Sequence, residues 1–394
     1  MNSQSPAAIL RPLLVPVFLP SVLMSIAEYA LLPVIPASAE KLGADIPTAA
    51  LIAGLLMVGV LLADLPAGRF VDQIGERNSM IYGSIIGAVG VILVALGHNL
   101  WLMSAGVLLL GIGIAIFALA RHAFFAEHIP LEFRARSLSL LGGTFRAGGF
   151  IGPVLGAWII SVAGVDAVFW FCAAVCLIAT LILAASEKDT IKSTPQTKPG
   201  GIWHIAKRER KSLLTLGVGA GLLGAIRTTR QIGLPLWALF IGISPEQASL
   251  YIGLAGALDF ALFYTSGQVM DRYGRFWAAV PPMLGLGLLH LTIVFVHDAP
   301  GFLILALAMA LANGLGSGII LTIGADLAPP DARNEYLASY RLITDIGVAS
   351  APPLLSLVAA GAGLGFAMST FGLIGIFGGL LMWRFLPTMI PKRH

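Results

Sequence analysis

The stretch GRFVDQIGER at residues 68–77 has a counterpart, GQVMDRYGRF, at residues 267–276. A glycine, an aspartate and a second glycine keep the same spacing in both stretches: Gly68, Asp72 and Gly75, then Gly267, Asp271 and Gly274. The two stretches are 199 residues apart in a chain of 394 residues. A repeat of half the chain length indicates two halves that are built alike.

The composition of the chain indicates whether it lies in water or in a membrane. Hydrophobic residues make up 57% of the chain and charged residues 11%, and the mean hydropathy is +0.90. These values are typical of integral membrane proteins. Runs of about 20 apolar residues, the length of a helix that crosses a bilayer, predict twelve spans. They cover 12–37, 46–67, 79–97, 100–120, 137–163, 165–185, 212–243, 247–270, 276–296, 301–325, 335–360 and 363–386.

The same offset of 199 residues aligns other segments without gaps. The further matches are Pro36 with Pro235, Glu127 with Asp326, Arg134 with Arg333, Gly148 with Gly347, and Pro153 with Pro352. We therefore expect an all-α polytopic protein of two pseudo-symmetric six-helix halves, related by an axis along the membrane normal.

One long polar connection, residues 186–211, divides the chain. It predicts an N-terminal half at 1–185 and a C-terminal half at 212–394. Its segment IWHIAKRER has the pattern of a short amphipathic helix on the anionic cytoplasmic leaflet, although a solvated linker explains it as well. Most Lys and Arg fall on one side, so we expect a plasma (inner) membrane protein with both termini cytoplasmic.

Several function classes find no support in the sequence. Cys172 and Cys176 lie four residues apart on one predicted span, where packing explains them better than a metal site or a disulfide. The glycines precede no nucleotide-binding element, and no hydrolytic triad is recognisable. We expect no enzyme activity, no cofactor, no metal and no nucleic-acid partner, because the net charge of +4 reflects the membrane topology.

The two signature loops, residues 68–77 and 267–276, resemble the loop signature G-x-x-x-D-[R/K]-x-G-[R/K]-[R/K] of the major facilitator superfamily. The second copy, with Arg275, fits better, since the first has Gln73 and Glu76 at positions where the family favours basic residues. We expect the glycines to permit tight helix ends and the aspartate to accept bonds from the next helix and from nearby arginine. The resemblance implies a functional monomer whose helices 1, 4, 7 and 10 line a cavity.

The stretch RAGGFIGPVLGAW at 146–158 is similar to an element of the drug–proton antiporter branches of that family. The similarity rests on Gly148, Gly152, Pro153 and Gly156. Small residues also let a helix approach its neighbour closely, so pure helix packing is the alternative. The helix 4 arginine of many proton-coupled members has no counterpart at Val107 or Leu110.

Charges within predicted spans are the candidate site. The offset places Glu28 of helix 1 opposite Arg227 of helix 7, and Arg230 lies on the same helical face as Arg227. Charges at membrane depth are tolerated when they face a cavity or one another. We expect either a substrate and proton site, with Glu28 titrating, or a structural ion pair.

Depth along the helices predicts two contacts between the halves. Asp64 and Arg341 lie equally far from the membrane surface, as do Arg146 and Asp259. Such pairs would hold the cytoplasmic side closed in one state of the transporter. A local pair of Arg341 with Asp345 competes with the first of them.

Other polar residues are less informative. Arg121 belongs to a basic group that a solvated cytoplasmic loop explains, and His290 is expected to be a packed or lipid-facing residue. Asn313, Trp237 and Phe240 are candidates for substrate contact.

These features together predict a secondary active transporter, with a proton-coupled exporter of small amphipathic or drug-like molecules as the leading hypothesis. An organic-anion exchanger or importer that uses Arg227 and Arg230 as counter-charge remains an alternative. A membrane sensor or scaffold without transport is the other.

Overall fold

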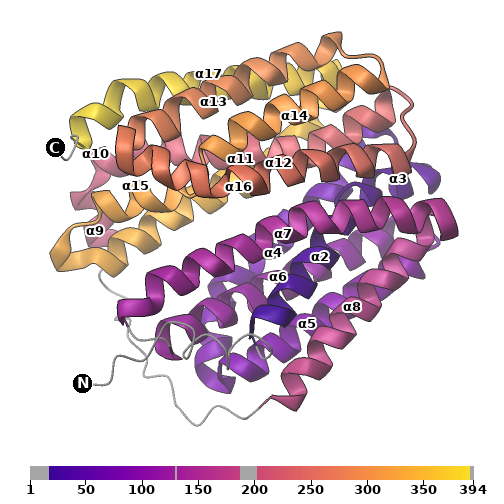
Figure 1. Cartoon of the computed structure of the whole chain (residues 1–394), viewed down its shortest axis with the longest axis horizontal. Coiled ribbons are helices and arrows are strands. Elements are labelled where there is room, and N and C mark those ends of the chain that lie inside the picture. Colours follow the sequence, from indigo (N-terminus) through magenta and orange to yellow (C-terminus); the bar gives the residue numbers. More distant parts are fainter. Residues whose placement is uncertain (1–16, 129–130, 187–201, 391–394) are drawn as a thin grey trace. The chain divides into compact units, whose positions relative to one another are not determined.

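The structure is a computed structural model that describes residues 17–128, 131–186 and 202–390 (Figure 1). Throughout these ranges the chain is helical and contains no strand. Eleven helices are long and apolar enough to cross a membrane. A bent pair, α2 (Leu19–Leu31) and α3 (Val34–Lys41), meets at 43° and adds a twelfth span if it counts as one. The predicted all-α, twelve-span fold is confirmed.

The chain divides into two compact units. Unit 1 comprises Met1–Asp45, Leu55–Pro195 and Ser244–Ala257, and unit 2 comprises Ile46–Gly54, Gln196–Ile243 and Leu258–His394. The N-terminal half contributes α4 (Ile46–Ile74), α5 (Glu76–Ala95), α6 (Leu100–His128), α7 (Leu131–Ala163) and α8 (Val165–Ala185) after the bent pair.

The C-terminal half begins with two short helices and a π-helical turn that leads into its first span. Its elements are α9 (Ile202–Arg208), α10 (Arg210–Ser212), the turn Leu213–Gly217, α11 (Val218–Phe240), α12 (Pro245–Tyr273), α13 (Arg275–Thr292), α14 (Ala299–Leu315), α15 (Ile319–Leu327), α16 (Arg333–Ala362) and α17 (Leu364–Met389). Short 3-10 turns, Ile293–Phe295 and Pro330–Ala332, follow α13 and precede α16.

Equivalent glycines start equivalent helices in the two halves. Gly75 precedes α5 with φ 84°, and Gly274, at the offset of 199, precedes α13 with φ 91°. These values are unfavourable for residues with a Cβ, so the second glycine of each signature loop is required by the backbone. By contrast, a Cβ on Gly68 or Gly267 would meet no atom within 4 Å.

Helix packing inside each half also follows the repeat. In unit 1, α7 crosses α2 so closely that a Cβ on Gly148 would lie 2.5 Å from Cβ of Ser25, and one on Gly152 would lie 2.6 Å from the carbonyl oxygen of Ile26. In unit 2, Gly347 of α16 meets Gly221 of α11 backbone to backbone. The glycines of the helix 5 element therefore have a packing role, as the alternative interpretation expected.

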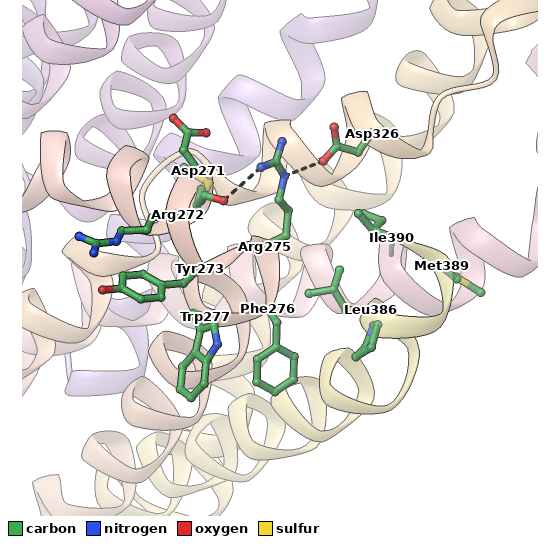
Figure 2. Close-up of a pocket in the computed structure, with 13 residues that line it drawn as sticks. Asp271, Arg272, Tyr273, Arg275, Phe276, Trp277, Asp326, Leu386, Met389 and Ile390 are labelled. Carbon is green, nitrogen blue, oxygen red and sulfur yellow. Dashed lines mark hydrogen bonds and ion pairs between the residues drawn. The ribbon is translucent and has the colours of Figure 1, made fainter. Parts of the chain in front are cut away.

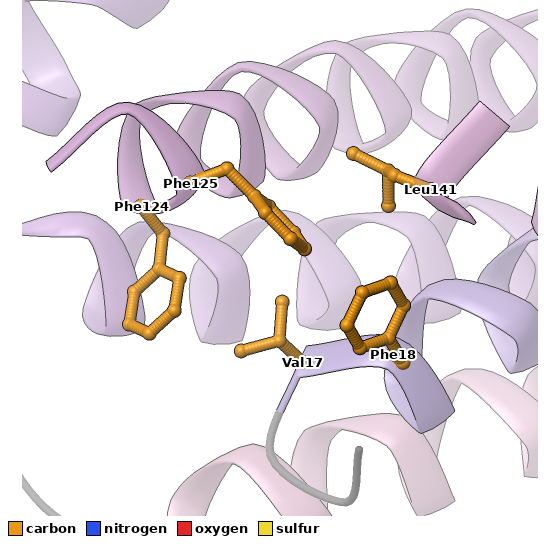
Figure 3. Packing of buried hydrophobic residues seen from close by; sticks show 5 residues of the cluster. All are labelled: Val17, Phe18, Phe124, Phe125 and Leu141. Carbon is orange, nitrogen blue, oxygen red and sulfur yellow. The ribbon is translucent and has the colours of Figure 1, made fainter. Parts of the chain in front are cut away.

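Aromatic packing joins three helices of unit 1 where α2 begins and α6 nears its end. The cluster consists of Val17, Phe18, Phe124, Phe125 and Leu141 (Figure 3). The rings of Phe18 and Phe125 meet edge to face, with centroids 5.3 Å apart. Such edge-to-face pairs add to the free energy of burial, and the cluster anchors the start of α2 against α6.

Candidate functional site

The clearest polar site within one unit is an ion pair between consecutive membrane helices. Nη2 of Arg230 on α11 donates to a carboxylate oxygen of Asp259 on α12 at 2.7 Å, and the two side chains are only 13% and 11% exposed. Nδ2 of Asn313 on α14 donates to both oxygens of that carboxylate at 2.9 Å. Three helices of unit 2 are thus joined through one carboxylate, which offsets the charge of Arg230.

Two backbone carbonyls extend this site along α14. Nη1 of Arg230 donates to the carbonyl oxygen of Met309 at 3.1 Å. Nη2 of Arg227 donates to the carbonyl oxygen of Gly316 at 2.8 Å, one residue beyond the end of α14. A Cβ at Gly316 would stand 3.0 Å from that same nitrogen, so a glycine at this position gives the guanidinium access to the backbone. Both arginines therefore bind groups of their own unit.

In unit 1, an arginine lies buried where the sequence predicted a solvated loop. α6 continues past residue 120 to His128, and Arg121 is 1% exposed. The carboxyl group of Glu28 on α2 is near enough to interact with it electrostatically. The placement of Arg121 in a cytoplasmic loop was wrong, because the helix and its burial extend beyond the apolar run that marked the span.

Aromatic rings surround the guanidinium of Arg121. Its central carbon lies 4.2 Å from the ring centroid of Phe145 on α7 and 5.5 Å from that of Phe117 on α6. A cation over an aromatic face gains about 2 kcal/mol when it is desolvated. Among the described residues, however, Nε and Nη2 of Arg121 have no hydrogen-bond acceptor. The chain has no arginine at Val107 or Leu110, the positions on α6 where many proton-coupled members have one. It has a buried arginine farther along the same helix, at Arg121.

The signature loop of unit 2 borders a cavity of about 930 Å³ (Figure 2). Nε of Arg275 donates to a carboxylate oxygen of Asp326 at 2.8 Å, and its Nη1 donates to the carbonyl oxygen of Met270 at 3.2 Å. No side-chain cap hydrogen bond is present at the start of α5 or α13. The residues at those starts are Gly75 and Gly274, which have no side chain, so the expected role of Asp72 and Asp271 stays a prediction, while the bonds of Arg275 hold the loop of unit 2.

The remaining predicted residues fall into two groups. Nε of Arg341 lies 3.3 Å from Asp345 four residues later, so the local alternative for Arg341 is formed. The pairs Asp64 with Arg341 and Arg146 with Asp259 join residues of different units, and they stay predictions, as does a meeting of Glu28 with Arg227. His290 is fully buried and its Nδ1 bonds to the carbonyl of Leu286 at 2.8 Å, which agrees with a packed histidine.

No group of three or more potential metal ligands occurs within the described residues. Trp237 is buried, and its indole Nε1 donates to the carbonyl oxygen of Val296 at 3.0 Å. Sequence reasoning identified Asp259 and Arg230 but assigned them other partners. Opposite charges on consecutive membrane helices, at similar distances from the turn at Gly242, are the signal that would have paired them.

Comparison with known proteins fits this architecture. The chain is 25% identical over 310 residues to the multidrug resistance protein MdtH of Enterobacter sp. (strain 638), covering 74% of this chain and 75% of that protein. Among solved structures, a bacterial homolog of the human lysosomal transporter Spinster has a TM-score of 0.80 at 13% identity and covers 100% of this chain and 99% of that one. A peptide transporter, POT, in complex with sulfate also has a TM-score of 0.80, at 13% identity, with 99% and 96% covered.

The family itself is shown by sequence. The family model described as Major Facilitator Superfamily matches residues 17–241 and 216–394, which is nearly the whole chain. Membership agrees with the twelve helical spans, the repeated signature loops and the charged residues inside the membrane. The chain is a multi-pass membrane transporter, not an enzyme, and it belongs to the Major Facilitator Superfamily.

Proposed function

We propose that the chain exports small amphipathic or drug-like molecules in exchange for protons, by alternating access. The observation that carries the proposal is the burial of Arg121 on α6 against the ring of Phe145, with Glu28 on α2 near enough for the two charges to interact. Ionisable residues at this depth are costly and mark substrate or proton pathways in membrane proteins. The similarity to proteins named for multidrug resistance supports an exporter.

The chemistry of this pair suits proton exchange. When Glu28 is ionised, its charge offsets that of Arg121, and when it is protonated the arginine keeps its positive charge. A cationic or polar substrate that binds ionised Glu28 would therefore compete with a proton for the same group. Coupling of this kind is reciprocal, since each ligand lowers the affinity for the other by the same factor.

The organic-anion alternative is less well supported by the charges. It relied on Arg227 and Arg230 as joint counter-charge for a substrate. Arg230 already has a carboxylate at 2.7 Å, so a substrate anion would have to displace Asp259 or bind near Arg227 alone. The chain belongs to a family of transporters, and no observation supports the sensor or scaffold hypothesis.

Alternating access would require latches that open and close. We keep Asp64 with Arg341 and Arg146 with Asp259 as the proposed pairs between the halves, with cytoplasmic termini and a functional monomer. Asp259 would then be shared between Arg230 and Arg146. Exchange of arginine partners on one carboxylate would connect the latch to the polar site of unit 2.

Transport in proteoliposomes tests the proposal. We would impose an outward or an inward proton gradient and follow a fluorescent lipophilic cation. Glu28→Gln keeps the shape of the side chain but cannot ionise, so it should lower gradient-driven transport by about 100-fold or more, the range lost when a proton-transfer group is removed. Glu40→Gln is the matched control, because Glu40 is an exposed carboxylate on α3, the second helix of the bent pair that contains Glu28.

The outcomes separate the hypotheses. Gradient-driven cation transport that survives Glu28→Gln would contradict the assignment of Glu28. Uptake of small organic anions that is lost in Arg227→Gln but kept in Glu28→Gln would replace the exporter by an anion exchanger.

A further inference from the structure

The short helix α9 is held against unit 2 at the membrane face that carries the turn Pro330–Ala332. Arg208 binds Asp331 of that turn through two nitrogens, at 2.7 and 3.1 Å. The hydroxyl of Tyr336 on α16 and that of Ser212 on α10 lie 3.0 Å apart, and Ile205 is 6% exposed. The helix, labelled in Figure 1, is therefore docked on its own unit through Arg208 and Ile205.

The outer face of the helix carries a stripe of exposed residues that leads to the bilayer. Trp203 and Lys207 are exposed four residues apart on α9, on one side of that helix. After the break at Glu209 the stripe continues with the exposed residues Arg210, Lys211 and Leu214. Leu214 is 66% exposed at the start of the segment Arg210–Phe240 that can cross the membrane. The stripe thus runs from a lipid-facing leucine through basic residues to an exposed tryptophan.

The composition of the stripe fits the headgroup region. Lys207, Arg210 and Lys211 form no ion pair with any described residue, whereas Arg208 is occupied by Asp331 and Glu209. Trp203 is 82% exposed. Tryptophan is enriched at membrane–water interfaces, and basic clusters next to a membrane helix attract anionic lipids.

We propose that this outer stripe of α9 and α10 binds the headgroups of anionic phospholipids in the bilayer around the transporter. Trp203 inserts its ring at the level of the ester groups, and Lys207, Arg210 and Lys211 contact the phosphates. The pair of Arg208 with Asp331 keeps the helix in the orientation that presents these groups. The site is independent of the transported substrate and of the proton pathway.

The quenching of Trp203 by brominated lipids tests the site. The full chain would be placed in phosphatidylcholine nanodiscs that contain increasing fractions of brominated phosphatidylglycerol or brominated phosphatidylcholine. The contribution of Trp203 is the difference between the parent protein and Trp203→Phe. We expect half-maximal quenching of this contribution at a lower mole fraction of phosphatidylglycerol than of phosphatidylcholine.

Charge substitution then separates an anion site from simple contact with lipid. Each of Lys207→Gln, Arg210→Gln and Lys211→Gln should raise the half-quenching fraction of phosphatidylglycerol by up to about fivefold, which corresponds to about 1 kcal/mol for each basic residue near an anionic surface. The phosphatidylcholine curve should not move, and added salt should weaken the preference. Trp101→Phe is the matched control, since Trp101 is 87% exposed at the start of α6.

Two results would overturn the proposal. Equal quenching by the two lipids would show that the stripe touches the bilayer without selecting anionic headgroups. Absence of quenching by both lipids, in variants that remain monodisperse and helical, would place α9 in water.

Discussion

Removal of Asp259 should be among the most damaging single changes to the stability of unit 2. The carboxylate offsets Arg230 at 2.7 Å, and the two side chains are 13% and 11% exposed. Asp259→Leu leaves the guanidinium buried without its counter-charge, which costs about 3–5 kcal/mol of unfolding free energy. Arg230→Leu likewise leaves the carboxylate of Asp259 buried without its counter-charge. Asn313→Ala should cost about 1.5–3 kcal/mol of unfolding free energy, because it removes a hydrogen bond to a charged group.

The double substitution is the decisive member of this series. When Arg230 and Asp259 are both replaced by leucine, neither charge of this ion pair remains, and such apolar replacements are often nearly neutral or stabilising. We therefore expect the double variant to be more stable than either single variant. The coupling energy between the two sites follows from the double-mutant cycle.

The assay is equilibrium unfolding of the purified protein in mixed micelles with increasing denaturing detergent, followed by helicity. The pair of Arg275 with Asp326 provides an internal comparison, because its distance is 2.8 Å but its side chains are 27% and 22% exposed. Asp326→Asn should cost less than Asp259→Leu, since solvent screens that pair more. A double variant whose loss equals the sum of the two single losses would refute the reasoning.

Two further predictions concern packing and pH. Gly148→Ala should lower the unfolding free energy by about 1–3 kcal/mol, because its methyl group meets Ser25 at 2.5 Å, whereas Gly143→Ala on the same helix meets no atom within 4 Å and should be neutral or stabilising in the same assay. The hydrogen bonds from Arg208 hold the pKa of Asp331 below its usual range, and the same contact raises the pKa of Arg208. The pair therefore contributes to the docking of α9 above pH about 4, the pKa of an unfolded aspartate, and loses this contribution as the pH falls through the lowered pKa. Hydrogen exchange of the α9 amides should be insensitive to this pair between pH 5 and 8 after correction for the intrinsic rate, and loss of protection in that window in the parent protein but not in Asp331→Asn would contradict it.

The fold could be predicted from the sequence because its signals are periodic and local. Runs of apolar residues give the spans, and the constant offset of 199 residues gives the repeat. The glycines at 75 and 274 follow the same logic, since a tight turn between two helices needs a residue without a Cβ. Each of these features depends on a few neighbouring residues.

The polar sites could be predicted only in part, because they depend on which helix faces meet. Arg121 was assigned to a loop since a charge at the end of an apolar run usually marks the end of a span, while burial on α6 and stacking on Phe145 are tertiary facts. Depth along the helices gave Asp259 a partner in the other half. The hairpin of α11 and α12 supplies Arg230 as a partner within one unit.

The repeat conserves packing and some of the charges near the loops, but not the charges of the polar sites within the spans, and this difference allows the two units to have different chemical roles. Equivalent glycines bring α7 onto α2 and α16 onto α11, so the backbone of one half is a template for the other. At the offset of 199 residues, however, Arg121 corresponds to Ile320, Arg230 to Leu31, and Asp259 to Val60. These three charged residues have apolar equivalents in the other half, and Glu28 has the opposite charge, Arg227, at its equivalent position. The polar site of unit 1 therefore contains an acid, Glu28, near the buried Arg121. The polar site of unit 2 contains Arg230, whose charge is already offset by Asp259. Two similar scaffolds with unequal charges can therefore respond differently to one proton.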